Sequence, residues 1–337
     1  MKIGSCRHVF SLIHHESFYD MLAVLSFVFS FIAVVLFLTG YSNTVLIAEG
    51  QLYGLSIDTT YSIGFVDNRL HGLLNPNATA MICLISVLVS LFLLKCYTGF
   101  IEGQKGKVIE TIIYFNISIQ IICLFLTKSR GEIFGLAIIS VFAMLVYFVK
   151  ELKSNKIWEI LKYLIFVIAF AIVFAVIFLS RFGGSDLSTG RLLIWKIGYE
   201  IFKWSPWIGM TREGMVRPVY DAIYAYSLTY NDGVIQSGLH NIYLTILVSS
   251  GVIGFVLISS AIIIVLYKAL FVIIKEEEID YPLFFSLLLV ALFLIVEFVE
   301  SRILYQVNLF NVVFWIYFGY LSYFSNIKYK KLKMGKV

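Results

Sequence analysis

Charged side chains are scarce in this chain. Of its 337 residues, 14% are charged, whereas 60% are hydrophobic and 17% are aromatic. A soluble domain usually carries about 25% charged residues, and one water-soluble core cannot bury this many apolar side chains. The composition therefore excludes an ordinary soluble protein and predicts a polytopic membrane protein. Its spans are expected to be helices, which gives an all-α fold, because open sheets cannot satisfy their backbone polar groups in hydrocarbon.

Motifs that hold metals or nucleotides are lacking as well. The sequence has no Asp-x-Asp motif, no His/Cys cluster and no Gly-rich phosphate loop. The four cysteines lie in the N-terminal tail and in or beside apolar segments, where small apolar filler is their expected role, and they show no disulfide framework. We therefore expect no cofactor, no metal and no nucleic-acid partner, although coordination by aspartates from separate loops stays open.

Long apolar runs are what the chain has in abundance. A spanning helix needs about 20 residues, and eight windows qualify: about 21–40, 77–94, 108–127, 131–149, 162–180, 241–267, 281–300 and 303–324. We expect a tail at 1–20, one transmembrane domain at 21–324 and a basic tail at 325–337. The polar segment 181–239 forms one large loop between spans five and six. Residues 1–20 are mixed polar and do not read as a cleavable signal peptide.

The distribution of basic residues gives the orientation. With both termini in the cytoplasm, 16 of the 26 lysines and arginines fall inside, as the positive-inside rule requires. Seven of the eight arginines fall outside, whereas 15 of the 18 lysines fall inside. Guanidinium groups bind phosphate or carboxylate with two parallel hydrogen bonds. The outer face is therefore predicted to recognise a phosphorylated or acidic ligand; contact of these arginines with lipid headgroups is the alternative.

Arg130 lies in the short turn Thr127–Glu132 between two predicted spans. The shortness of the turn places the side chain at or just below the outer membrane interface. An arginine at that depth costs a few kcal/mol unless it is paired or hydrated. Either Glu132 pairs with it, or it faces a cavity between helices and binds the phosphates of a lipid carrier.

The large loop contains a predicted amphipathic helix that follows Gly190 and ends at Pro206. Its apolar residues recur at helical spacing: Leu192, Trp195, Tyr199 and Phe202. Such a helix lies in the membrane interface. Arg191 then stands near a helix N-terminus, where anions bind well. A plain interfacial helix without a ligand is the alternative.

His240 opens the sixth predicted span in a chain with five histidines. Imidazole side chains can take a proton near neutral pH, so a catalytic base is one role for His240 and a helix cap is the other. At the second span, Asn75 and Asn77 flank Pro76. They either bind a polar ligand or form a structural turn.

In their order, these segments resemble the O-antigen ligase and O-antigen polymerase superfamily over roughly residues 65–320. The matching elements are Gly72-Leu73-Leu74-Asn75-Pro76-Asn77, Ser129-Arg130-Gly131, Ser188-Thr189-Gly190-Arg191 with Trp195, Pro206-Trp207-Ile208-Gly209, His240-Asn241 with Tyr243, and Gly251-Val252-Ile253-Gly254. Members of this superfamily usually carry more spans. The chain is therefore expected to be a short variant, to begin late or to be completed by a partner.

The resemblance implies a helical bundle related to C-type glycosyltransferases in the bacterial cytoplasmic (inner) membrane. Such proteins transfer glycan from undecaprenyl pyrophosphate to an acceptor sugar on the outer face, without a nucleotide sugar or a metal. Arg130 and Arg191 would hold the pyrophosphate, and His240 would activate the acceptor hydroxyl. The other expected substrate-binding residues are Arg69, Asn75, Asn77, Arg181, Trp195, Asn241 and Tyr243.

The function that we predict is a polysaccharide polymerase of the O-antigen or capsule type, which joins lipid-linked repeat units. A ligase that transfers finished glycan to an acceptor is the alternative with the same site. A glycolipid transporter or flippase is the alternative from another class, but the sequence shows neither an internal repeat nor a pair of broken helices. Membrane lipid and a chain-length regulator or flippase of the same pathway are the expected partners.

Overall fold

The computed structural model describes residues 15–52, 55–66, 68–97, 104–151, 191–230, 238–305 and 308–334. The chain divides into two compact units. The first unit comprises residues 1–136 and 280–285, and the second comprises residues 137–279 and 286–337. The described residues are mostly helical, as the composition predicts.

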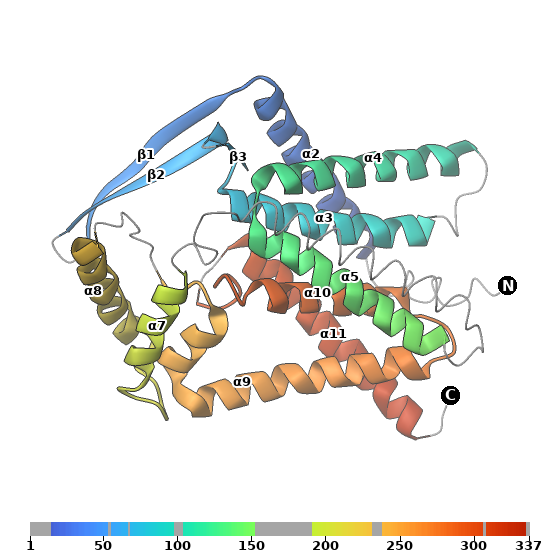
Figure 1. Ribbon diagram of the computed structural model, residues 1–337. Helices are drawn as coiled ribbons and strands as arrows, with labels where there is room; N and C mark the ends of the chain where they lie inside the picture. Colours follow the sequence, from blue (N-terminus) through green and yellow to red (C-terminus); the bar gives the residue numbers. More distant parts are fainter. Residues whose placement is uncertain are drawn as a thin grey trace. The chain divides into compact units, whose positions relative to one another are not determined.

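Three helices and a small sheet form most of the first unit. The helices are α2 (His15–Leu38), α3 (Pro76–Tyr97) and α4 (Gln104–Thr127). Helices α3 and α4 run side by side (Figure 1), and α3 is buried along most of its length. Buried side chains join the helices: Ser30 donates to Gln120 at 2.6 Å, and Asn116 donates to Ser90 at 2.9 Å. Hydrogen bonds of this kind hold helices together where hydrophobic burial contributes little.

The sheet is a departure from the expected all-α fold, and it lies between the predicted windows 21–40 and 77–94. It is antiparallel, in the order β1 (Ser42–Leu52), β2 (Leu55–Val66) and β3 (Arg69–Gly72). Pairing between the strands satisfies the backbone within the sheet. Its open edges would remain unsatisfied in hydrocarbon, so the sheet belongs on the aqueous side of a membrane boundary.

Helix α5 (Arg130–Glu151) starts in the first unit and continues into the second. The second unit also contains α7 (Arg191–Phe202), α8 (Arg212–Tyr230), α9 (Ile242–Lys275), α11 (Leu309–Lys333) and most of α10 (Tyr281–Val296). Helices α9 and α11 pack against each other (Figure 1). The described residues between α10 and α11, 297–305 and 308, lie outside both helices.

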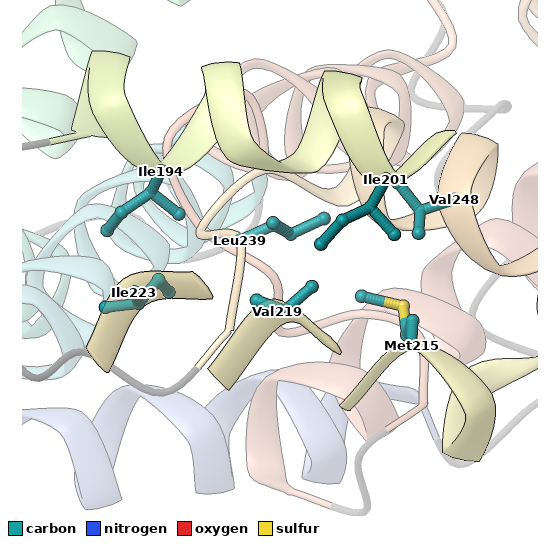
Figure 2. Packing of buried hydrophobic residues seen from close by; sticks show 7 residues of the cluster. All are labelled: Ile194, Ile201, Met215, Val219, Ile223, Leu239 and Val248. Atoms are coloured by element: carbon teal, nitrogen blue, oxygen red, sulfur yellow. The ribbon is translucent and has the colours of Figure 1, made fainter. Parts of the chain in front are cut away.

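Helix α7 confirms the helix predicted in the large loop, but a different face is buried. Ile194, Gly198 and Ile201 are its buried residues, whereas Leu192 and Tyr199 are exposed. Figure 2 shows the apolar cluster that α7 forms with α8 and the start of α9: Ile194, Ile201, Met215, Val219, Ile223, Leu239 and Val248. The helix therefore has two apolar faces, one of them packed into this cluster and the other unpacked.

Helix α9 is broken at Gly251, which has φ 64° and ψ −173°. The turn 205–211, which follows α7, fills the break. Four backbone hydrogen bonds join them: Val252 N to Pro206 O at 2.8 Å, Ile253 N to Trp207 O at 3.2 Å, Met210 N to Val248 O at 2.9 Å, and Thr211 N to Ser249 O at 2.9 Å. The two parts of α9 are thus fixed by the same turn.

Four helices in the described part of the chain are long and apolar enough to cross a membrane: Pro76–Lys95, Gln104–Thr127, Arg130–Val149 and Ile242–Lys275. The apolar stretches in α2 and α10 are shorter. Two predicted windows had wrong edges, since α10 ends at Val296 and α11 begins at Leu309 after the cap Asn308. Window 162–180 lies outside the described residues, so the count of eight spans and the place of the large loop stay predictions.

Candidate functional site

Three charged or titratable side chains of the second unit meet at the carboxylate of Glu300. Arg191, the first residue of α7, donates from Nη2 to Glu300 Oε1 at 2.9 Å. Arg302 Nη2 lies 3.4 Å from the same oxygen, and His240 Nδ1 lies 3.7 Å from Oε2. The side chain of Glu300 is 9% exposed. Segments that are far apart in the sequence thus share one buried ion-pair network.

The network keeps Glu300 ionised. Burial alone would raise the pKa of its carboxyl, but the contact with His240 and the charges of Arg302 and Arg191 outweigh burial and lower that pKa to about 2. Opposite charges at short distance favour the charged form in this way. Two guanidinium groups therefore stand beside one carboxylate, which leaves an excess of positive charge for an anionic ligand.

Glu297 stabilises the segment that carries Glu300 and Arg302. Its Oε2 accepts the backbone N–H of Arg302 at 2.7 Å, and its own carbonyl accepts the N–H of Ile242 at 3.0 Å. Burial raises the pKa of Glu297 to about 7. This residue links the start of α9 to the segment that carries Glu300, and so fixes the distance between His240 and Glu300.

Two hydrogen-bond donors on α7 are buried without an acceptor among the residues that the structure describes. They are Nε of Arg191 and Nε1 of Trp195, one helical turn apart. The indole ring packs edge-on against Phe298, with ring centroids 5.5 Å apart. Buried donors without partners are costly, and oxygen atoms of a bound ligand would satisfy them.

The backbone around His240 is tightly specified. His240 has φ 45°, in the left-handed region, which non-glycine residues adopt rarely and mostly at special sites. Asn241 caps α9, because its side-chain oxygen accepts the N–H of Leu244 at 3.0 Å. The hydroxyl of Tyr243 donates to the carbonyl of Leu294 at 2.6 Å. Asn241 and Tyr243 thus hold the frame around His240, and contact with a substrate stays a prediction for both.

The predicted binding residues of the first unit form a second polar cluster. Arg69 donates to the carbonyl of Thr127 at 3.0 Å and to Asn77 Oδ1 at 3.3 Å. The hydroxyl of Ser129 donates to the same oxygen of Asn77 at 2.8 Å. These bonds tie β3, the start of α3 and the end of α4 to one another.

Asn75 caps α3, since its side-chain oxygen accepts the N–H of Ala78 at 2.8 Å. The structural turn considered for Asn75-Pro76-Asn77 is therefore present. Arg130 is the first residue of α5 and is half-buried, and the neighbouring Glu132 is buried and accepts a hydrogen bond from Ser129.

Five of the predicted site residues lie in the second unit: Arg191, Trp195, His240, Asn241 and Tyr243. Arg130, Arg69, Asn75 and Asn77 belong to the first unit, and Arg181 lies outside the described residues. The roles predicted for all of them stay predictions. Among the described residues, no group of three or more His, Cys, Asp or Glu side chains could hold a metal ion.

Sequence reasoning missed Glu300 and Arg302 as members of the site. For Arg302, one of the arginines predicted on the outer face, contact with lipid headgroups was the alternative to ligand recognition; its side chain is buried, with its guanidinium 5.3 Å from the ring centroid of Phe310. The signal in the sequence was the group of charges Glu297, Glu300 and Arg302 at the end of an otherwise apolar window. Charged residues in a predicted membrane-spanning window mark functional sites.

Comparison with known families gives one match. Residues 115–259 match the model of the family described as O-Antigen ligase. The comparison with curated proteins gives no match. The matched range contains Arg130, Arg191, Trp195 and His240, and also the broken part of α9. This match supports the resemblance of the chain to the O-antigen ligase and O-antigen polymerase superfamily.

Proposed function

We propose that the chain is a glycan polymerase, which transfers an oligosaccharide from a polyprenyl-pyrophosphate carrier to the end of another lipid-linked repeat unit. The match of residues 115–259 to the O-antigen ligase family supports a ligase or polymerase type of function with lipid-linked glycan substrates. The observation that carries the proposal is the meeting of Arg191 and His240 at Glu300.

In this proposal, Arg191 holds the pyrophosphate of the donor. Its Nη2 is engaged by Glu300, while its Nε and the Nε1 of Trp195 are buried without an acceptor in the described part of the chain. Phosphate oxygens are acceptors that could satisfy these donors. Arg130 is the second arginine assigned to the pyrophosphate. Fixed guanidinium groups stabilise the negative charge that grows on a leaving pyrophosphate.

His240 is the proposed general base. Glu300 faces Nδ1 of the imidazole, so Nε2 is the nitrogen that can accept the proton of the acceptor hydroxyl. As this proton is transferred, the hydroxyl oxygen forms a bond to the anomeric carbon. The bond from that carbon to the phosphate oxygen breaks, and the pyrophosphate leaves with the electron pair. One such displacement inverts the configuration at the anomeric carbon.

A ligase uses the same site with another acceptor, and it remains the second candidate function. The glycan profile of a deletion strain distinguishes the two. Loss of a polymerase leaves one repeat unit on each carrier, whereas loss of a ligase leaves full-length polymer on the carrier. A profile that shows glycan confined to the cytoplasmic face would instead support the transporter.

The chemistry is tested by the substitution His240→Ala in the purified full chain, reconstituted with a lipid-linked donor. We expect transfer to be abolished while binding of the donor is retained. Full activity of this variant would show that His240 has only a structural role at the start of α9.

The outer-face location is tested by a reporter fused after Ser227, because we place both termini on the cytoplasmic side of the bacterial inner membrane and this loop outside. A cytoplasmic signal would reverse the orientation.

A further inference from the structure

The turn 205–211 has a second, outward-facing side that the proposed chemistry does not use. Trp204, just before the turn, is 66% exposed, and Trp207 and Ile208 are 67% and 73% exposed. Three large apolar side chains exposed within five residues would be an unfavourable surface in water. The same turn is held rigidly by its four backbone bonds to α9, so these side chains are presented by a fixed backbone.

This apolar surface is continuous with the face of α9 that is available to lipid. The backbone N–H of Ile253 bonds to Trp207 itself. From Ile253 onward, large apolar residues of α9 are exposed: Ile253, Val256, Leu257, Ile263 and Ile264. Helix α9 is one of the helices apolar enough to cross a membrane. The surface of the turn thus extends a membrane-spanning surface at one end.

The length of α9 indicates where the membrane boundary lies. The helix has 34 residues, which at about 1.5 Å per residue is far longer than the roughly 30 Å of hydrocarbon in a bilayer. Lys268 is its first charged residue. Counted back from Lys268, the roughly 20 residues that cross a bilayer end within one turn of Gly251. The break and the exposed tryptophans therefore fall at the same depth.

The break in α9 is compatible with a position at the membrane boundary. Unsatisfied backbone groups are not tolerated in hydrocarbon, and the turn supplies partners to both sides of the break. Tryptophan is enriched at membrane interfaces, because its ring is apolar and its N–H is polar. The exposed residues Leu192 and Tyr199 on the unpacked face of α7 also favour contact with the membrane interface.

We propose that Trp204, Trp207 and Ile208 insert into the boundary between headgroups and acyl chains of the outer leaflet. In this arrangement only the part of α9 from Val252 onward crosses the membrane. His240, which precedes α9, and Arg191, at the start of α7, then lie on the aqueous side of that boundary. Figure 1 shows the start of α9 beside α7. The partner of this surface is bilayer lipid, and the inference does not depend on glycosyl transfer.

Tryptophan fluorescence tests the proposal in the full chain, reconstituted in vesicles of phosphatidylethanolamine and phosphatidylglycerol. One vesicle set contains lipid brominated near the headgroup, and a second contains lipid brominated near the end of the acyl chain. The chain has five tryptophans, so the variants are Trp204→Phe, Trp207→Phe and the double variant, which keep an aromatic ring. The matched control is Trp195→Phe, since Trp195 is half-buried and packs against Phe298.

We expect the shallow bromolipid to quench the parent chain more than the deep one. The double variant should lose about half or more of the shallow quenching, as placement of both rings at the interface requires, while Trp195→Phe should keep it. Unchanged shallow quenching in the double variant would overturn the proposal. Stronger quenching of these two residues by the deep bromolipid, or by aqueous iodide, would overturn it as well.

Discussion

Glu300 is the acceptor that two arginines and a histidine of the second unit share, so Glu300→Gln removes the negative charge while keeping the shape of the side chain. The depression of the Glu300 pKa from 4.5 to about 2 corresponds to about 3 kcal/mol at 1.36 kcal/mol per pKa unit. Breaking a buried ion pair by removing one partner costs roughly 3–5 kcal/mol. Both routes give a large effect because Glu300 is almost fully buried.

From about 3 kcal/mol, at about 2–4 °C per kcal/mol, we therefore expect the thermal midpoint of Glu300→Gln to fall by roughly 6–12 °C. The sign of the pH dependence follows from the lowered pKa. The stabilisation by Glu300 is present above its unfolded pKa near 4.5 and disappears only as the pH falls through about 2. The stabilisation that the variant lacks should therefore persist at neutral pH and disappear only in strong acid.

Glu300 acts through His240 and Arg191, so its loss should affect turnover more than donor binding. We expect kcat to fall about 100-fold, which corresponds to about 2.7 kcal/mol, with a small change in KM. The assay is elongation of a lipid-linked repeat unit by the full chain in vesicles. Glu300→Asp, which keeps the charge, should restore the thermal midpoint and part of the rate.

The matched control for this experiment is Glu276→Gln. Glu276 pairs with Lys328 at 2.8 Å, also in the second unit, but both side chains are partly exposed. Exposed pairs contribute about 0–1 kcal/mol, so this variant should retain the parent midpoint and rate. An unchanged midpoint and rate in Glu300→Gln would refute the role assigned to the carboxylate. An equal loss in Glu276→Gln would show a general response to charge removal.

Three further predictions concern the arginines, the second glutamate and the broken helix. Arg191→Lys and Arg130→Lys keep the charge but lose the planar fork of donors, so we expect polymer to vanish at normal protein level; normal polymer would remove the pyrophosphate role. Burial raises the pKa of Glu297 to about 7, so the parent loses stability as the pH rises from about 4.5 to about 7. Glu297→Gln should flatten this dependence of the thermal midpoint, and an unchanged slope would assign it to another group. Gly251→Ala places a Cβ 2.3 Å from the carbonyl of Trp207 at φ +64° and should lower the midpoint strongly. At Gly319 a Cβ would meet nothing within 4 Å, so Gly319→Ala should be neutral or stabilising, and equal effects at both glycines would refute the role of the break.

The sequence predicted those elements that depend on local pattern. The apolar windows 77–94, 108–127 and 131–149 correspond to α3, α4 and α5 within a few residues, because a run of apolar residues is sufficient to indicate a spanning helix. The helix α7 was predicted from its spacing, but not its buried face, since both of its faces are apolar. The β1–β2 hairpin was missed although its strands are neighbours in the sequence, because its polar residues indicated only a connection between two apolar windows.

The candidate site was predicted only in part, because local pattern indicates some of its residues but not the contacts between them. His240 and Arg191 stand out as a scarce residue and as a charge at a helix start, so single positions indicate them. Their connection does not show in the sequence, because Arg191 and Glu300 are 109 residues apart. Glu300 also lies beyond the matched range 115–259. Its role emerges only when the segment after α10 is placed against α7.

The two glycine-containing segments Pro206–Gly209 and Gly251–Gly254 looked independent in the sequence, and the structure explains both by one contact. A Cβ on Gly209 would come 2.3 Å from the backbone of Ser249, and a Cβ on Gly251 would come 2.3 Å from that of Trp207. Both glycines have positive φ, so each has two reasons to lack a side chain. A larger residue in either segment would force the turn 205–211 away from α9. That would move α7, which carries Arg191, relative to the helix start that carries His240, so the two segments together determine the geometry of the site.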